Sequence, residues 1–368
     1  MEKFKDMKAR KKSNIIMIRN LIFFVLLIVF TFWYIFKDQD LNELRNVIKS
    51  ANLLYVFIGF MLMFFSYLME SINIRSLLIC LGEKKFSIFR AYKFTAIGAF
   101  FSALTPGSTG GQPAEVYYMT KDGIKATNGT LAMLMELCGF QISSILLSII
   151  CGILNPSLLS GSLVWFYILG IVVNGCVLTG MLLGMFSNKL TRKFINFVIK
   201  LMKKIGIKGY EKKKIKLEEG INQYIESAKY IKENKMVFVK SVLRVFIQVS
   251  LYHSIPYFIY RSFGLNELGF FNLFAMQSIL YTTVAAIPVP GSIGVSETLF
   301  MKLYGTAFGT TLLSGAMLLC RFVSFYIHII IFTVIVILNA VKTKKTLGEI
   351  DHSVIEIEKD FDNNLVYS

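Results

Sequence analysis

The sequence has few of the residues from which metal sites and disulfide scaffolds are built. Its 368 residues include only three histidines, His253, His328 and His352, which are too widely separated for a metal-ligand motif. The five cysteines all lie in or beside apolar segments: Cys80, Cys138, Cys151, Cys176 and Cys320. We interpret them as small buried residues, not as a disulfide framework. The sequence also shows no nucleophile–base constellation and no nucleotide-binding loop. We therefore expect that the protein binds no cofactor and is not an enzyme.

Charged residues are absent from several long stretches, while apolar residues make up 55% of the chain and the mean hydropathy is +0.59. Several apolar runs exceed the roughly 18–20 residues needed to cross a bilayer. The net charge of +17 collects beside these runs, as expected for cytoplasmic loops near anionic lipid and not for a nucleic-acid site. The sequence therefore predicts an all-α polytopic membrane protein.

Prolines are scarce as well, and four of the six lie in two short stretches, residues 103–115 and 286–297. In each stretch a proline precedes a glutamate by nine positions, and glycines fill the gap. Broken backbone at membrane depth is tolerated only where protein or a water-filled cavity surrounds it. Two such breaks in corresponding places are typical of a transporter's binding site.

The distribution of charge predicts five parts of the chain. They are a basic cytoplasmic N-terminus at 1–15, a first membrane half at 16–187, a basic amphipathic cytoplasmic segment at 188–235, a second membrane half at 236–340 and a cytoplasmic tail at 341–368. Full spans are expected at about 16–36, 51–80, 127–153, 161–187, 236–260 and 308–340. The cytoplasmic segment is expected to form two amphipathic helices on an anionic leaflet.

The two broken stretches fall in segments that we interpret as re-entrant helical hairpins, 91–125 and 270–305. Basic residues flank the first hairpin, whereas the loops around the second, Arg261–Gly269 and Gly305–Thr310, carry almost no positive charge, so the two hairpins enter from opposite sides. Each hairpin lies between two spans: 51–80 and 127–153 for the first, 236–260 and 308–340 for the second. This order predicts two inverted repeats whose hairpin tips meet near the midplane.

The glutamates of the two breaks allow a structural and a functional interpretation. With Gln112 as the cap and Pro113 in the first turn, Glu115 takes the third helical position, and Glu297 does the same if Gly294 is the cap. A glutamate there satisfies free amides and complements the helix dipole. The functional hypothesis is that two helix N-termini bind a phosphate while the glutamates attract an amine of the same head group.

Other ionisable residues are expected at membrane depth, where charge is costly and is by default paired or functional. Arg244 is expected to snorkel, and Glu70 and Arg75 to lie near the cytoplasmic end of their span. Glu136 and Arg321 lie well inside the last span of each repeat. They either form an ion pair with each other or line the cavity.

The candidate head-group site combines both breaks with this internal pair. Its residues are Thr105, Pro106, Gly107, Gly110, Gly111, Gln112, Glu115, Pro290, Gly291, Gly294, Ser296, Glu297, Glu136 and Arg321. The expected partner is an anionic membrane phospholipid, or one whose head group also carries cationic groups, without direct contact to nucleic acid. The lipid moved, its direction and driving force, and the oligomeric state stay open.

The stretches FFSALTPGSTGGQPAEVYYMTKDGIKA at 100–126 and IPVPGSIGVSETLF at 287–300 resemble the two signature stretches of a known family. This is the lysylphosphatidylglycerol synthase transmembrane region, the flippase-like domain of multiple peptide resistance factors and their stand-alone relatives. The resemblance implies a lipid flippase of the plasma membrane, with both termini cytoplasmic, that exports aminoacylated phosphatidylglycerol and contributes to resistance against cationic antimicrobial peptides.

The bifunctional members of that family carry a soluble domain after the spans that transfers lysine from lysyl-tRNA. The tail at 341–368 is too short for such a domain, so we expect this chain not to be an enzyme. Two alternatives remain: a phosphatidylglycerol lysyltransferase, as family naming suggests, or a membrane subunit that recruits a separately encoded synthase.

Overall fold

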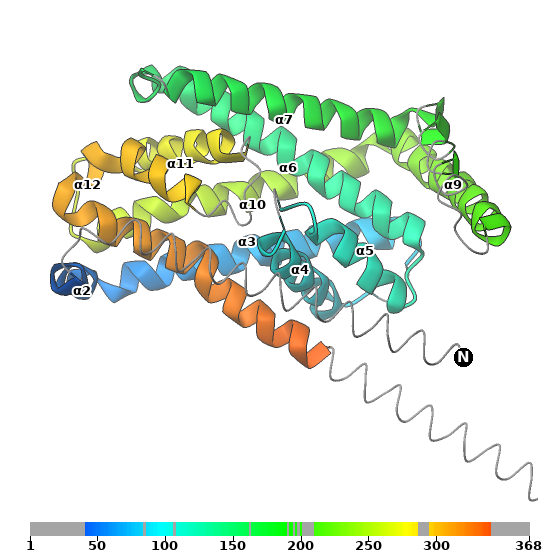
Figure 1. Ribbon diagram of the computed structural model, residues 1–368, viewed down its shortest axis with the longest axis horizontal. Helices are drawn as coiled ribbons and strands as arrows, with labels where there is room; N and C mark the ends of the chain where they lie inside the picture. Colours follow the sequence, from blue (N-terminus) through cyan, green and yellow to red (C-terminus); the bar gives the residue numbers. More distant parts are fainter. Residues whose placement is uncertain are drawn as a thin grey trace, which may run out of the picture.

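The computed structural model describes residues 41–339 except for 84–85, 106–107, 162, 190, 194–195, 197–198, 201–209 and 286–293. Every regular element within these residues is helical (Figure 1). The elements are α2 (Leu41–Ser50), α3 (Leu53–Cys80), α4 (Ile88–Ala103), α5 (Gly111–Lys121), α6 (Ala126–Leu154), η2 (Pro156–Leu158), α7 (Leu163–Phe186), α9 (Tyr210–Glu233), α10 (Lys235–Ser262), α11 (Phe270–Ala285), α12 (Val295–Arg321) and η4 (Phe322–Tyr326). The predicted all-α class is confirmed.

Five helical segments of the described residues are long and apolar enough to cross a membrane. They are α3, α6, α7, α10 and the segment Val295–Asn339, and they coincide with five of the six predicted spans. The protein is therefore a multi-pass membrane protein. The expected span at 16–36 and both termini lie outside the described residues.

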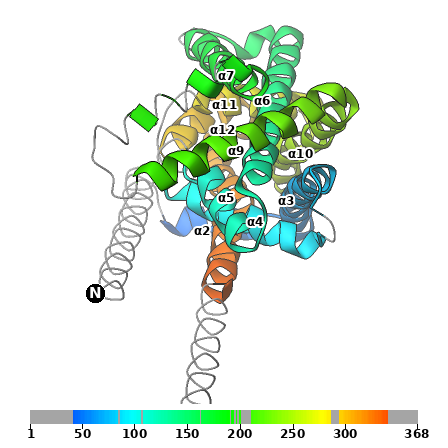
Figure 2. The ribbon, with the colours of Figure 1, turned by 90° about the vertical axis from the view of Figure 1, so that its right-hand side faces the viewer.

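The spanning helices run lengthwise through the molecule, and α9 lies across one end of them (Figures 1 and 2). Large apolar side chains face outward, as a lipid environment requires. On α7 these are Trp165, Phe166, Leu169 and Val172.

Helices α3 and α10 pack closely against each other along their length and run antiparallel. Residue numbers rise along α3 as those of the contacting residues fall along α10. Three hydrogen bonds fix this register: Asn52 N to Ser262 O (2.8 Å), Ser66 Oγ to Gln248 O (3.0 Å) and Asn73 Nδ2 to Ser241 Oγ (2.9 Å).

The elements of the second half repeat the lengths and spacing of the first. Helices α3 and α10 each have 28 residues, and α4 and α11 each have 16. Helices α10 and α11 begin 182 residues after α3 and α4, respectively, and the contact between Ser66 and Gln248 joins residues of the same separation. Corresponding positions thus meet where α3 and α10 cross.

Helix α4 and helix α5 pack closely, and the start of α4 lies beside the end of α5. Arg90 and Lys93 near the start of α4 both form ion pairs with Asp122, the residue after α5. A Cβ atom on Gly111 would lie 2.7 Å from the carbonyl oxygen of Gly98. Only glycine at position 111 allows this approach of the two backbones.

Helix α12 reverses direction at Gly309, inside the predicted loop 305–310. Gly309 has φ 64° and ψ 173°, which are not helical. The 24 residues from Glu297 to Arg321 would extend about 36 Å in a straight helix, yet these two side chains are bonded. The part of α12 before Gly309 therefore folds back against the part after it, and the last span comprises residues 310–339.

Helix α9 packs its apolar face on the ends of α6 and α7. Ala228 and Ile231 are buried, and the hydroxyl of Tyr224 donates to the carbonyl of Gly184 at 3.5 Å. The face that we assigned to a lipid leaflet thus contacts protein along these residues.

Candidate functional site

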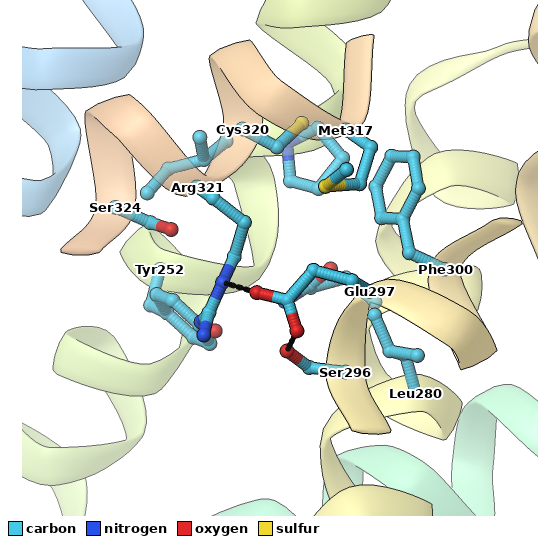
Figure 3. Close-up of a pocket in the computed structure, with 12 residues that line it drawn as sticks. Tyr252, Leu280, Ser296, Glu297, Phe300, Met317, Cys320, Arg321 and Ser324 are labelled. Atoms are coloured by element: carbon cyan, nitrogen blue, oxygen red, sulfur yellow. Dashed lines mark hydrogen bonds and ion pairs between the residues drawn. The ribbon is translucent and has the colours of Figure 1, made fainter. Parts of the chain in front are cut away.

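Glu297 is held by three donors at the N-terminus of α12. Its Oε2 accepts from the backbone N–H of Gly294 at 2.7 Å and from the hydroxyl of Ser296 at 2.9 Å. Its Oε1 accepts from Arg321 Nε at 2.6 Å (Figure 3). Gly294 is the cap and Glu297 the third helical position, as predicted. Arg321 pairs with Glu297, so the Glu136–Arg321 ion pair, one of the two alternatives for these residues, is wrong.

The Glu297–Arg321 pair lies in a pocket at the junction of α10, α11 and α12. The Glu297 side chain is 2% exposed and that of Arg321 14%. The guanidinium of Arg321 lies 4.7 Å from the ring centre of Phe325, in the π-helical turn η4 that directly follows Arg321. Figure 3 shows Tyr252 and Ser324 beside the guanidinium.

The first break is built differently from the second. Helix α5 begins at Gly111 with Gly110 as its cap, so Gln112 and Pro113 are the second and third helical residues. Glu115 is then the fifth, beyond reach of the cap. The hydroxyl of Thr105 accepts from the N–H of Gly110 at 2.9 Å. The predicted Gln112 cap and the predicted capping position of Glu115 are therefore wrong.

The Glu115 side chain points instead toward α4 and is 3% exposed. A Cβ on Gly98 would lie 1.6 Å from Glu115 Oε1, so the carboxylate occupies space that only glycine at position 98 leaves free. The other oxygen, Oε2, is buried and has no hydrogen-bond partner among the described residues.

Glu115, Glu70 and Glu136, from α5, α3 and α6, form a group that we term the carboxylate cluster; Glu115 and Glu136 are buried and Glu70 is partly buried. The charge of Glu115 interacts with those of Glu70 and Glu136, and Glu70 interacts with Glu136. Glu136 is 7% exposed. Its Oε1 has no hydrogen-bond partner in the described part of the chain.

Amide side chains connect this cluster to α3 and α10. Gln248 Nε2 donates to Glu70 Oε2 at 3.1 Å, and Asn73 Nδ2 donates to Glu136 Oε2. Asn73 Oδ1 in turn accepts from Arg244 at 3.5 Å, so Arg244 does not simply snorkel. The sequence analysis missed Asn73 and Gln248, because single amides within apolar helices carry no motif.

Two partly buried tyrosines, Tyr67 on α3 and Tyr252 on α10, lie near the carboxylate cluster and the Glu297–Arg321 pair, respectively. The hydroxyl of Tyr67 is within electrostatic range of Glu70 and Tyr252. Tyr252 is within range of both Arg321 and Glu297. Tyr67 and Glu70 are one turn apart on α3, near the middle of that helix. Polar side chains near the middle of α3 and α10 thus lie close to both sites.

Several residues that the sequence analysis singled out lie outside the described residues or apart from the cluster. Pro106, Gly107, Pro290 and Gly291 lie outside the described residues. Arg75 lies apart from the cluster, where its Nε donates to the carbonyl of Phe86 at 2.7 Å.

Comparison with known sequences shows the origin of this architecture. Residues 18–331 match the lysylphosphatidylglycerol synthase TM region. The chain belongs to this family. The match includes every candidate site residue and confirms the resemblance of the two broken stretches.

A UPF0104 membrane protein of Archaeoglobus fulgidus is 22% identical to this chain over 314 residues. The alignment covers 84% of this chain and 94% of the archaeal protein. Membership of the lysylphosphatidylglycerol synthase TM region family agrees with a multi-pass membrane protein whose function concerns membrane lipids.

Proposed function

We propose that this protein moves a polar lipid between membrane leaflets and that the head group passes through the centre of the bundle. The observation that carries this proposal is a set of polar side chains at the middle of α3 and α10: the carboxylate cluster, the partly buried Tyr67 and Tyr252, and Arg321 in its pocket. Apolar side chains would be the less costly choice at that depth.

The carboxylate cluster supports a binding role over a purely structural one. A structural ion pair satisfies its partners, as Glu297 and Arg321 do, because an unpaired buried charge is strongly destabilising. Glu115 and Glu136 each retain a buried oxygen without a hydrogen-bond partner in the described residues. Such groups recognise a cationic donor.

The head group that fits is one with ammonium groups and a phosphate, such as that of an aminoacylated phosphatidylglycerol. The ammonium belongs at Glu70, Glu115 and Glu136. Glu297 is occupied by Gly294 and Arg321, so it is not the second amine ligand that the sequence suggested. A phosphate would compete with Glu297 for Arg321, since guanidinium binds phosphate and carboxylate with similar geometry.

The repeated register of the two halves supports transport by alternating access. An inverted repeat places equivalent helices antiparallel about a two-fold axis in the membrane plane. Helices α3 and α10 have equal length, run antiparallel and touch at corresponding residues. Glu115 and Glu297 share the same 182-residue separation as that contact. On this proposal α4–α5 and the start of α12 with α11 are the two re-entrant hairpins.

The biological setting follows from the lipid. We place the protein in the plasma membrane with the basic α9 segment and both termini in the cytoplasm. Export of a cationic lipid would lower the negative charge of the outer surface and so weaken the attraction of cationic antimicrobial peptides.

The family's name favours one other candidate, a phosphatidylglycerol lysyltransferase or a membrane subunit of one. We propose that the chain itself is not the enzyme and that any synthase is a separate partner. Purified protein in liposomes with labelled lysyl-phosphatidylglycerol on one leaflet separates these functions. We expect lipid to reach the opposite leaflet without tRNA, faster than in protein-free liposomes. Formation of lysyl-lipid from lysyl-tRNA would establish the enzyme, and transport only after a synthase is added would establish the subunit.

A further inference from the structure

The carboxylate cluster faces more negative than positive groups. Its own members are Glu70 on α3, Glu115 on α5 and Glu136 on α6. The ionisable groups around them are the hydroxyl of Tyr67 on α3, Tyr92 on α4 and Arg244 on α10. Among the described residues, Arg244 is the cationic side chain bonded to this network, and it reaches Glu136 only through Asn73. Three carboxylates thus face one indirectly placed guanidinium.

Three buried oxygen atoms of this site can accept hydrogen bonds from a ligand. Glu115 Oε2, Glu136 Oε1 and Gln248 Oε1 are buried and lack hydrogen-bond partners in the described residues. Gln248 is 6% exposed and already donates to Glu70, so its free oxygen is an acceptor held next to the carboxylates. All three atoms are acceptors when the glutamates are ionised, so they call for a donor with several N–H or O–H groups.

Three carboxylates that share such a site need compensation by cations or protons, because an unpaired charge at low dielectric is costly. In the described part of the chain they do not converge as a metal-ligand set. Protons and an organic ammonium are therefore the cations that suit the cluster.

We infer that the carboxylate cluster is an exchange site, which carries protons when it is empty and releases them when an ammonium head group enters. This inference rests on the proposed function. The ammonium keeps its own protons and donates N–H hydrogen bonds to Glu115 Oε2 and Glu136 Oε1. Each carboxyl group that ionises gives its proton to water on the side to which the site is open. One positive charge enters for each proton that leaves.

The consequence is that movement of a cationic lipid is coupled to opposite movement of protons. The anionic parent lipid, phosphatidylglycerol, has no ammonium and would not trigger release. A pH gradient across the membrane would then set the direction of transport for the lysyl-lipid.

Proton release can be measured without transport. Purified protein in detergent micelles, in weak buffer with a pH indicator, is mixed with lysyl-phosphatidylglycerol, phosphatidylglycerol or lysine methyl ester, all adjusted to the same pH. Binding of radiolabelled lipid is measured in parallel. We expect about one proton released per lysyl-lipid bound, and none with phosphatidylglycerol.

Variants make the test specific to the cluster. Glu136→Gln and Glu115→Gln should reduce proton release at least several-fold, Glu136→Asp should retain it, and the exposed control Glu226→Gln should match the wild type. A monodisperse size-exclusion profile establishes that each variant is folded.

The outcomes separate the exchange from the transport. Lysyl-lipid that binds, or is translocated in liposomes, without proton release overturns the exchange and leaves lipid transport standing. Absence of lysyl-lipid binding overturns both. Release by lysine methyl ester alone would assign a soluble amine as the ligand and overturn the lipid exchange.

Discussion

The two breaks place a glutamate at corresponding positions and use it in opposite ways. Glu297 caps α12 and pairs with Arg321, so that both of its oxygens are bonded. Glu115 lies past the first turn of α5, points to Gly98 and keeps one oxygen without a partner in the described residues. A backbone with repeated register therefore carries an asymmetric charge distribution: a closed ion pair in one half and open carboxylates in the other.

The difference between the two glutamates indicates a separate role for each half of the protein. A pair whose charges satisfy each other stabilises one arrangement of α12 and η4, whereas unsatisfied carboxylates gain most when a cation arrives. On the proposed function, the first half would recognise the head group, and the pair in the second half holds the folded α12 together.

The largest effect is expected from breaking the closed pair. Arg321→Met leaves Glu297 buried without its cation, and loss of one partner of a buried pair costs roughly 3–5 kcal/mol. Thermal unfolding in detergent should show a clear loss of stability. The double variant Arg321→Met with Glu297→Gln should recover most of it, because Gln still accepts from Gly294. A double variant as unstable as the sum of both single changes would show that the two side chains are not coupled.

A smaller effect is expected at Gly98, where a methyl group would collide with Glu115 Oε1. Gly98→Ala should displace the carboxylate from the cluster, at a cost of roughly 1–3 kcal/mol for overpacking. We expect transport of lysyl-lipid in liposomes to fall more than thermal stability does. Gly175→Ala on α7 is the matched control, since a Cβ there meets no atom within 4 Å in the structure. Equal transport in both variants would place Glu115 outside the head-group path.

Much of this fold could be predicted from the sequence because local rules govern it. Apolar runs located four of the described spans to within two residues. The fifth, predicted at 308–340, matches the part of the segment Val295–Asn339 that follows the break at Gly309. The cap of α12 also followed from local sequence, since a glutamate three residues after a glycine can reach back to the free N–H at position 294. The reversal at Gly309 falls inside the loop expected at 305–310.

The first break was placed wrongly because proline does not distinguish the positions of a first turn. Pro113 was expected to open the helix, but α5 begins two residues earlier and Pro113 is third. The first turn has no intrahelical acceptor for its N–H groups, so a proline at the third position loses nothing. The hydroxyl of Thr105, which accepts from Gly110, is the feature that local spacing did not reveal.

The partner of Arg321 could not be predicted because it depends on tertiary packing. Glu136 and Glu297 were both carboxylates at suitable depth, and the fold at Gly309 decides between them by bringing Glu297 to Arg321. The carboxylate cluster depends in the same way on contacts between α3, α5, α6 and α10, which lie far apart in the sequence.

The same substitution in both breaks tests the central claim most directly. Glu115→Gln and Glu297→Gln are reconstituted in liposomes, and the rate ratio of lysyl-phosphatidylglycerol to phosphatidylglycerol translocation is measured per folded protein. We predict that Glu115→Gln loses most of the preference for the lysyl-lipid, because a charge-assisted contact at low dielectric is lost. Glu297→Gln should retain that preference while it lowers thermal stability. Equal loss of preference in both variants, or an unchanged preference in Glu115→Gln, would contradict the division between an open and a closed half.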